Sequence, residues 1–92
     1  MKTDYLLNHE QRHFDLAESG AREFRKKLKQ ARFTPENFQK EVQNITREID
    51  EKYKKLQQQY DKESDHSRNE EKQNEWNQKI DSMLKGFEEY KR

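Results

Sequence analysis

Turn-forming residues are the scarcest feature of this chain, and they constrain its fold most. Among 92 residues there are only 2 glycines and 1 proline. Folds made of many short strands need frequent turns, so a β-sandwich, a β-barrel or a doubly wound α/β domain is hard to place on this sequence. The sequence predicts an all-α fold in which three long helices form an antiparallel hairpin or bundle. Residues 1–92 then form one small helical domain.

The composition predicts a thin core. Hydrophobic residues make up 27% of the chain and charged residues 42%, yet the formal net charge is only +1. Average domains contain roughly 45–50% apolar residues, so low stability is expected. The absence of cysteine excludes disulfides and thiolate metal sites. No apolar run approaches the ~20 residues of a membrane span, and no signal-peptide core follows Met1.

Apolar periodicity places the three helices. The first is predicted over about residues 4–32, the second over about 35–61 and the third over about 68–90, with a loop at 62–67. The second and third helices each carry a single narrow apolar stripe. These stripes comprise Phe38, Val42, Ile45, Ile49, Tyr53, Leu56 and Tyr60, and then Trp76, Ile80, Met83, Leu84, Phe87 and Tyr90.

Two short motifs predict helix starts. Thr34 suits an N-cap, and Pro35 suits the first helical position because its missing N–H group is not needed there. Ser67 and Glu70 have the spacing of a Ser-x-x-Glu capping box, in which each side chain bonds a backbone N–H of the first turn.

One motif on the first helix carries chemistry. Residues 9–13 read His-Glu-Gln-Arg-His, which matches H-E-x-x-H. Histidines four residues apart share one helix face, so His9 and His13 can both reach one metal ion. Glu10 can take a proton from a metal-bound water, which makes it the candidate catalytic base. The plainer alternative is that both histidines are ordinary residues of an amphipathic helix.

A catalytic zinc site needs a third protein ligand. His66 is the remaining histidine, and a loop that folds back after the second helix would bring it toward His9. Asp61 and Glu63 lie closer in register with the first helix and are rival ligands. Either of them could instead accept a hydrogen bond from a ligand histidine.

Three segments carry a family resemblance. Residues 2–18 (KTDYLLNHEQRHFDLAE), residues 60–67 (YDKESDHS) and residues 72–77 (KQNEWN) together resemble the bacterial family named domain of unknown function 922. The members of that family are described as candidate zinc-dependent proteases. Its second motif reads Tyr-Asp-x-Glu-x-x-His-Gly, and Ser67 stands here in place of the glycine.

The resemblance implies a zinc-dependent metallopeptidase that acts on peptide or protein substrates, or the metal-binding helical part of one. The implied zinc ligands are His9, His13 and His66, with Glu10 as general base. The family usually has a β-rich segment before the H-E-x-x-H helix, and this sequence lacks it. An extracytoplasmic location in bacteria, periplasmic or secreted, is also implied only by the resemblance.

Other features have two interpretations. The apolar stripes can form a core, or they can support self-association as a non-catalytic helical protein. Cations over residues 22–32 suit the C-terminal end of a helix, and no nucleic-acid partner is predicted. Tyr60 and Trp76 are expected to pack in the core, although Tyr60 could stabilise an oxyanion and Trp76 could line a substrate pocket.

Overall fold

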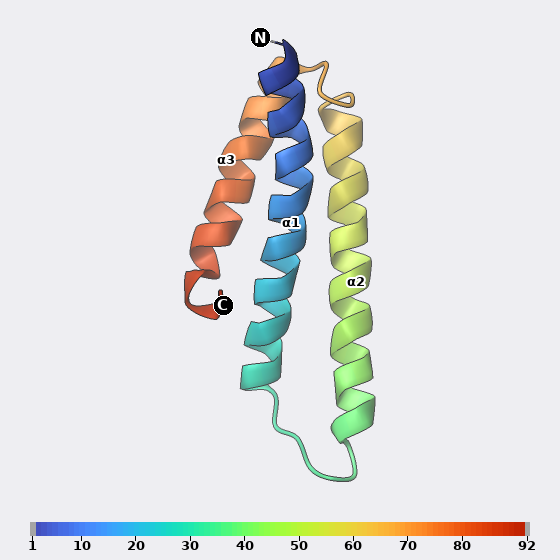
Figure 1. The fold of residues 1–92 in the computed structure, drawn as a ribbon. Coiled ribbons are helices and arrows are strands. Elements are labelled where there is room, and N and C mark those ends of the chain that lie inside the picture. Colours follow the sequence, from blue (N-terminus) through green and yellow to red (C-terminus); the bar gives the residue numbers. More distant parts are fainter. Residues whose placement is uncertain (1, 92) are drawn as a thin grey trace.

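A computed structural model describes residues 2–91, and all of its regular elements are helical (Figure 1). Helix α1 spans Lys2–Gln30, α2 spans Phe38–Glu63 and α3 spans Glu70–Gly86. A short 3₁₀ turn, η1, spans Glu88–Tyr90. No strand occurs among the described residues, and the predicted all-α fold is confirmed.

Helix α1 is the central element. It lies between α2, which runs antiparallel to it, and α3, which runs parallel to it (Figure 1). Helices α1 and α2 are much longer than α3 and set the length of the slim molecule, which measures 54 by 23 by 17 Å. Within the described part of the chain, no helix has the length and apolar character that crossing a membrane requires.

The apolar core lies where the three helices meet. Leu16 from α1, Tyr60 from α2, and Trp76 and Ile80 from α3 form one buried cluster. Each is at most 3% exposed. The predicted stripes of the second and third helices therefore supply most of the core, but Phe38, the first residue of α2, is 52% exposed.

A polar cluster joins α1 and α2 beyond the apolar core, toward the C-terminal half of α1. The Tyr53 hydroxyl donates to Glu23 Oε1 at 2.8 Å and lies 3.2 Å from Ser19 Oγ. Lys52 Nζ donates to the same carboxylate at 2.8 Å. Gly20 lets the Tyr53 ring lie against α1, because a Cβ atom there would lie 3.1 Å from the ring. Hydrogen bonds and an ion pair thus join the two helices beyond the end of the apolar core.

The cations near the end of α1 bind the C-terminal segment. Arg22 Nη1 donates to the Leu84 carbonyl at 2.8 Å, and Arg25 Nε donates to the Tyr90 carbonyl at 2.6 Å. These carbonyls belong to the end of α3 and to η1, which leave some backbone acceptors without helical partners. The basic stretch therefore has a structural role in capping this end of the chain.

The second helix starts later than the Thr34-Pro35 pair predicts. The Thr34 amide donates to Asn37 Oδ1 at 2.8 Å, and the Asn37 amide donates to Thr34 Oγ1 at 3.2 Å. This reciprocal pair closes a tight turn over residues 34–37, and regular helix begins at Phe38.

The predicted capping box at Ser67 is wrong. Asn69 caps α3 instead, and its side chain accepts a hydrogen bond from the Lys72 amide at 3.0 Å. Asp65, His66 and Ser67 have φ values of 50°, 54° and 85°, so the chain turns through three successive left-handed residues. A left-handed backbone favours glycine, which suits the glycine that the resembling family has in place of Ser67.

We expect Glu23 to stabilise the fold at neutral pH and not in acid. Burial alone would raise its pKa, but hydrogen bonds from Lys52 and Tyr53 outweigh burial and hold the pKa of Glu23 below its ordinary value of 4.5. A depressed carboxyl pKa contributes stability above the unfolded-state pKa and loses it as the pH falls through the folded-state pKa. Glu23→Gln should lower the free energy of unfolding at pH 7 by about 1–2 kcal/mol.

Denaturant unfolding of both proteins between about pH 3 and pH 7 measures this difference, which should close at the acid end. The matched control is Glu51→Gln, which alters an exposed glutamate of α2 and should have little effect. An equal loss of stability at both ends of the pH range would contradict the assignment of Glu23 as a buried carboxylate held ionised by its partners.

Candidate metal centre

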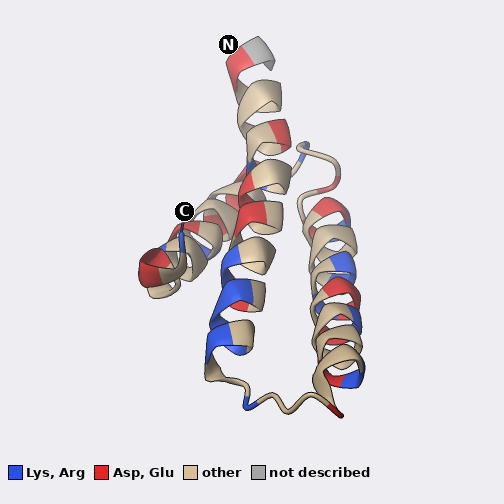
Figure 2. Cartoon of the chain, turned by 60° about the horizontal axis from the view of Figure 1, so that its bottom comes forward, with Lys and Arg blue, Asp and Glu red and all other residues tan. Residues whose placement is uncertain are grey.

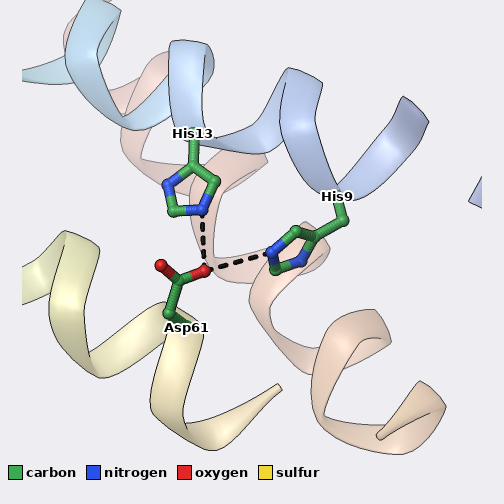
Figure 3. Close-up of side chains that lie close together, drawn as sticks. All are labelled: His9, His13 and Asp61. Carbon is green, nitrogen blue, oxygen red and sulfur yellow. Dashed lines mark hydrogen bonds and ion pairs between the residues drawn. The ribbon is translucent and has the colours of Figure 1, made fainter. Parts of the chain in front are cut away.

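Two histidines and one carboxylate converge between α1 and α2 (Figure 3). His9 and His13 lie one helical turn apart on α1, and Asp61 lies in the last turn of α2. Asp61 Oδ1 is 3.1 Å from His9 Nε2 and 2.8 Å from His13 Nε2. His9 is only 4% exposed, whereas His13 and Asp61 are half-buried. The site is therefore shielded from solvent at His9 and accessible to solvent at His13 and Asp61.

A buried hydrogen-bond chain fixes the proton on the His9 ring. The Tyr60 hydroxyl donates to the His9 carbonyl at 2.8 Å, because a carbonyl can only accept. Burial raises the pKa of Tyr60 to about 12, which keeps this hydroxyl protonated. The same hydroxyl oxygen accepts from Gln73 Nε2 at 2.8 Å, so Gln73 Oε1 faces His9 Nδ1 at 2.7 Å. Nδ1 must then carry a proton, and Nε2 faces Asp61 Oδ1 at 3.1 Å.

A second glutamine fixes His13 in the same way. Gln57 Nε2 donates to the His13 carbonyl at 2.9 Å, which turns Gln57 Oε1 toward His13 Nδ1 at 2.5 Å. The Nδ1 atom of His13 therefore donates, and its Nε2 also faces Asp61. Both histidines thus have the tautomer that suits metal binding through Nε2, with an amide oxygen holding the other nitrogen.

The three inner atoms fit a cation. With both rings neutral, two Nε2 lone pairs and one carboxylate oxygen meet here, and a positive charge between them relieves their repulsion. Protons on the two rings can supply that charge through Nε2–H bonds to Asp61 Oδ1, and one metal ion bound by all three atoms can take their place. Ligand atoms around a tetrahedral Zn²⁺ lie roughly 3.3–3.4 Å apart. The two Nε2–Oδ1 separations, 2.8 and 3.1 Å, are shorter than this by about 0.2–0.6 Å, and all three ligand atoms lie within 4.8 Å of one another.

The other acidic candidates lie outside this group. Glu10 follows His9 on α1 and is exposed to solvent, and its carboxylate is not among the converging atoms. Glu63 faces α3 instead, because its carboxylate accepts from Trp76 Nε1 at 3.0 Å and from Gln59 Nε2 at 2.7 Å. The hydrogen bond from Gln59, with a further one from Trp76, holds the pKa of Glu63 below its usual range.

His66 is not brought to the histidines of α1. Its side chain is exposed, and its backbone amide donates to the Asp61 carbonyl at 2.9 Å. Helix α2 continues to Glu63 before the left-handed turn sends the chain toward α3. Asp61, which lies in register with His9 and His13, takes the third place among the described residues.

Neither glutamine of this site was identified from the sequence. Gln73 precedes Trp76 by three residues and Ile80 by seven, so it continues the apolar stripe of α3, and it is fully buried. A polar residue on an otherwise apolar stripe is the signal that points to it. Gln57 lies one turn before Asp61 on α2, at the same helical spacing that joins His9 to His13.

We expect Gln73 to hold the His9 ring in its metal-binding tautomer. Gln73→Met keeps a similar volume but removes the acceptor for His9 Nδ1–H. Nitrogen-15 NMR of the metal-free protein should show that His9 loses its uniform Nδ1-protonated state, while His13 keeps it. Zinc affinity should fall about 10- to 100-fold, as is usual when such a supporting partner is lost.

Gln78→Met is the matched control for that experiment. It makes the same substitution at an exposed glutamine of the same helix, and both histidines should keep their spectra. An unchanged His9 spectrum in Gln73→Met would show that this glutamine does not fix the tautomer.

Comparison with protein families identifies a matching family. The family described as "Bacterial protein of unknown function (DUF922)" matches residues 2–67, which is well over half of the chain. The matched segment contains His9, His13 and Asp61, whereas Gln73 lies beyond it in α3. Searches of curated proteins and of solved structures found no match.

Proposed function

Because the chain belongs to the DUF922 family of bacterial proteins, we propose that it is the metal-binding helical part of a zinc-dependent metallopeptidase. One observation carries this proposal. The Nε2 atoms of His9 and His13 converge on Asp61 Oδ1 at 3.1 and 2.8 Å, and a glutamine oxygen lies against Nδ1 of each ring. His9, His13 and Asp61 would hold the metal, and Glu10 would act as general base.

The donor set supports hydrolytic chemistry. Catalytic zinc has three protein ligands and one position left for water, and the bound ion lowers the pKa of that water toward neutrality. Glu10 is exposed beside His9, where its carboxylate can orient the attacking water and take its proton. Gln57 and Gln73 keep the ligand rings from rotating. Two histidines and one carboxylate also suit Fe²⁺, so the metal itself needs a direct comparison.

Zinc binding is the first test. Titration of the metal-free protein should show one Zn²⁺ per chain, bound more tightly than Fe²⁺. A ligand that binds only the folded state should stabilise it by about 2.7 kcal/mol at a hundredfold excess over the dissociation constant. His13→Ala and Asp61→Asn should each weaken binding by more than about 100-fold, since losing a supporting partner alone costs up to that much.

Two variants make this test specific. Asp65→Asn removes an exposed carboxylate close in sequence to Asp61 and should leave zinc affinity unchanged. His66→Ala tests the ligand implied by the family resemblance. If His66→Ala abolishes binding and Asp61→Asn does not, the third ligand is His66. If no zinc binds at all, the proposed function fails.

Hydrolysis is the second test. The zinc-loaded protein should cleave an unfolded protein such as reduced casein, with products identified by mass spectrometry, and a chelator should abolish cleavage. Glu10→Gln should lower the rate by about 10²–10⁴-fold without changing zinc affinity, because Glu10 is not placed as a ligand. Glu51→Gln on α2 is the control. Cleavage that survives Glu10→Gln would contradict its role as base. Binding of one zinc ion per chain without cleavage would support a metal site but not peptidase activity.

Self-association without catalysis is the second candidate function. Leu6, Leu7 and Phe14 of α1 are 53%, 66% and 70% exposed. Large apolar side chains exposed to water do not stabilise a monomer, whereas a contact between copies would bury them.

A further inference from the structure

One face of α1 is covered by neither α2 nor α3. Phe14, Ala17, Ala21, Phe24 and Leu28 recur at alternating spacings of three and four residues, so they form one stripe along the helix. Each of these residues is exposed or half-buried. The stripe borders an open apolar groove of about 370 Å³ between α1 and α2, whose walls include Ala17, Ala21, Phe24 and Tyr53.

The stripe has a mirrored pattern along the helix. Phe14 and Leu28 lie seven residues on either side of Ala21. Two copies of α1 that run antiparallel and cross at Ala21 would therefore place Phe14 of each copy against Leu28 of the other. The small Ala21 side chains at the crossing point let the two backbones approach closely, and large residues meet at both ends.

Helix α2 has a mirrored pattern of charge on the same groove. Asp50 and Lys54 both line it, both are exposed, and they lie one turn apart. An antiparallel copy centred on residue 52 would pair Asp50 with Lys54 of the second copy, and Lys54 with Asp50 of the second copy. A two-fold contact of this kind is self-complementary in charge.

The centre of the apolar pattern, residue 21 of α1, and the centre of the charge pattern, residue 52 of α2, lie at the same level along the helix axes. Glu23 of α1 pairs with Lys52 of α2, and Gly20 lies against the Tyr53 ring. Residue 21 of α1 is therefore level with residue 52 of α2. One two-fold axis through the groove satisfies the apolar pattern on α1 and the charge pattern on α2 together.

The charge along α1 sets the direction of packing. Between residues 2 and 16 there are three acidic and two basic side chains, and between 17 and 30 there are two acidic and five basic ones. Figure 2 shows the blue cationic bands gathered toward the C-terminal half of this helix. Parallel packing would set the two cationic halves against each other, whereas antiparallel packing sets each against the partner's more acidic half.

The available area suits a dimer of moderate strength. The stripe from Phe14 to Leu28 together with its flanking turns is about 30 Å long, and two packed helices are about 20 Å wide. This face offers roughly 600 Å² per copy, somewhat less than the about 800 Å² of a standard interface.

We propose that a second copy of this chain packs antiparallel on the α1–α2 groove, with the two-fold axis at Ala21. The contact uses none of the candidate metal ligands, so it stands or falls independently of the metallopeptidase proposal. Its edge nevertheless lies close to the metal centre, because Ala17 is one turn from His13. The cationic end of the second copy's α1 would then border the approach to Glu10.

Sedimentation equilibrium in chelator tests this proposal. The wild-type chain should show a monomer–dimer equilibrium with a dissociation constant on the order of 10 μM. Ala21→Glu should weaken it by at least about thirtyfold, because two carboxylates would meet unpaired at the axis. Ser82→Glu adds the same charge at an exposed position of α3 and should leave it unchanged. Circular dichroism checks that each variant is folded.

A charge exchange tests the orientation. Asp50→Lys and Lys54→Asp should each weaken the dimer by about tenfold, since each places two like-charge pairs across the axis. The double variant should restore association to within about threefold of the wild type. A monomer up to about 1 mM, a dimer indifferent to Ala21→Glu, or a double variant no better than either single one would overturn the proposal.

Discussion

The Tyr60 hydroxyl is the interaction on which the rest of this structure depends. It belongs to α2, donates to the His9 carbonyl of α1 and accepts from Gln73 of α3, so one atom joins the three helices. Because this hydroxyl is fully buried, leaving either partner unmatched would cost the desolvation of a polar group. A shift of any one helix along its axis by one turn would break at least one of these hydrogen bonds. The register of the bundle and the protonation of His9 therefore have the same cause.

Polar contacts of this kind compensate for a small apolar core. Only six apolar or aromatic residues are buried among those described, and four of them form the one cluster in a molecule 54 Å long. Further along, Glu23, Lys52 and Tyr53 join α1 to α2, and Arg22 and Arg25 hold the C-terminal segment. Hydrophobic burial is not directional, whereas each of these bonds requires one specific alignment. A chain with 27% hydrophobic residues can thus still specify one arrangement of its helices.

Much of the fold follows from the sequence because helical periodicity is a local property. The three helices, their antiparallel order and the shared face of His9 and His13 depend on spacing and on the scarcity of glycine and proline. Asp61 was also within reach of sequence reasoning, since register along a hairpin follows from chain length. The direction in which the chain leaves α2 was not. Three left-handed residues, Asp65, His66 and Ser67, send it toward α3, and no periodic pattern encodes such a turn. The roles of Gln57 and Gln73 depend on which way an amide faces, which only the assembled hydrogen-bond network decides.

A metal ion at this site would act on the structure as well as on a substrate. His9 and His13 belong to α1 and Asp61 to α2, so one ion would cross-link the two longest helices near the end where the α2–α3 turn lies. The two Nε2 atoms and the Asp61 carboxylate already lie within hydrogen-bond distance there, and an ion between them would attract all three. Folding and metal binding are therefore coupled. The contacts that hold the helices in register also assemble the ligands, and the bound ion in turn stabilises the folded state. A second copy on the open groove would act on the same pair of helices from their other face. It would supply apolar contacts where the monomer has mainly polar ones, and so would favour the same alignment of His9, His13 and Asp61.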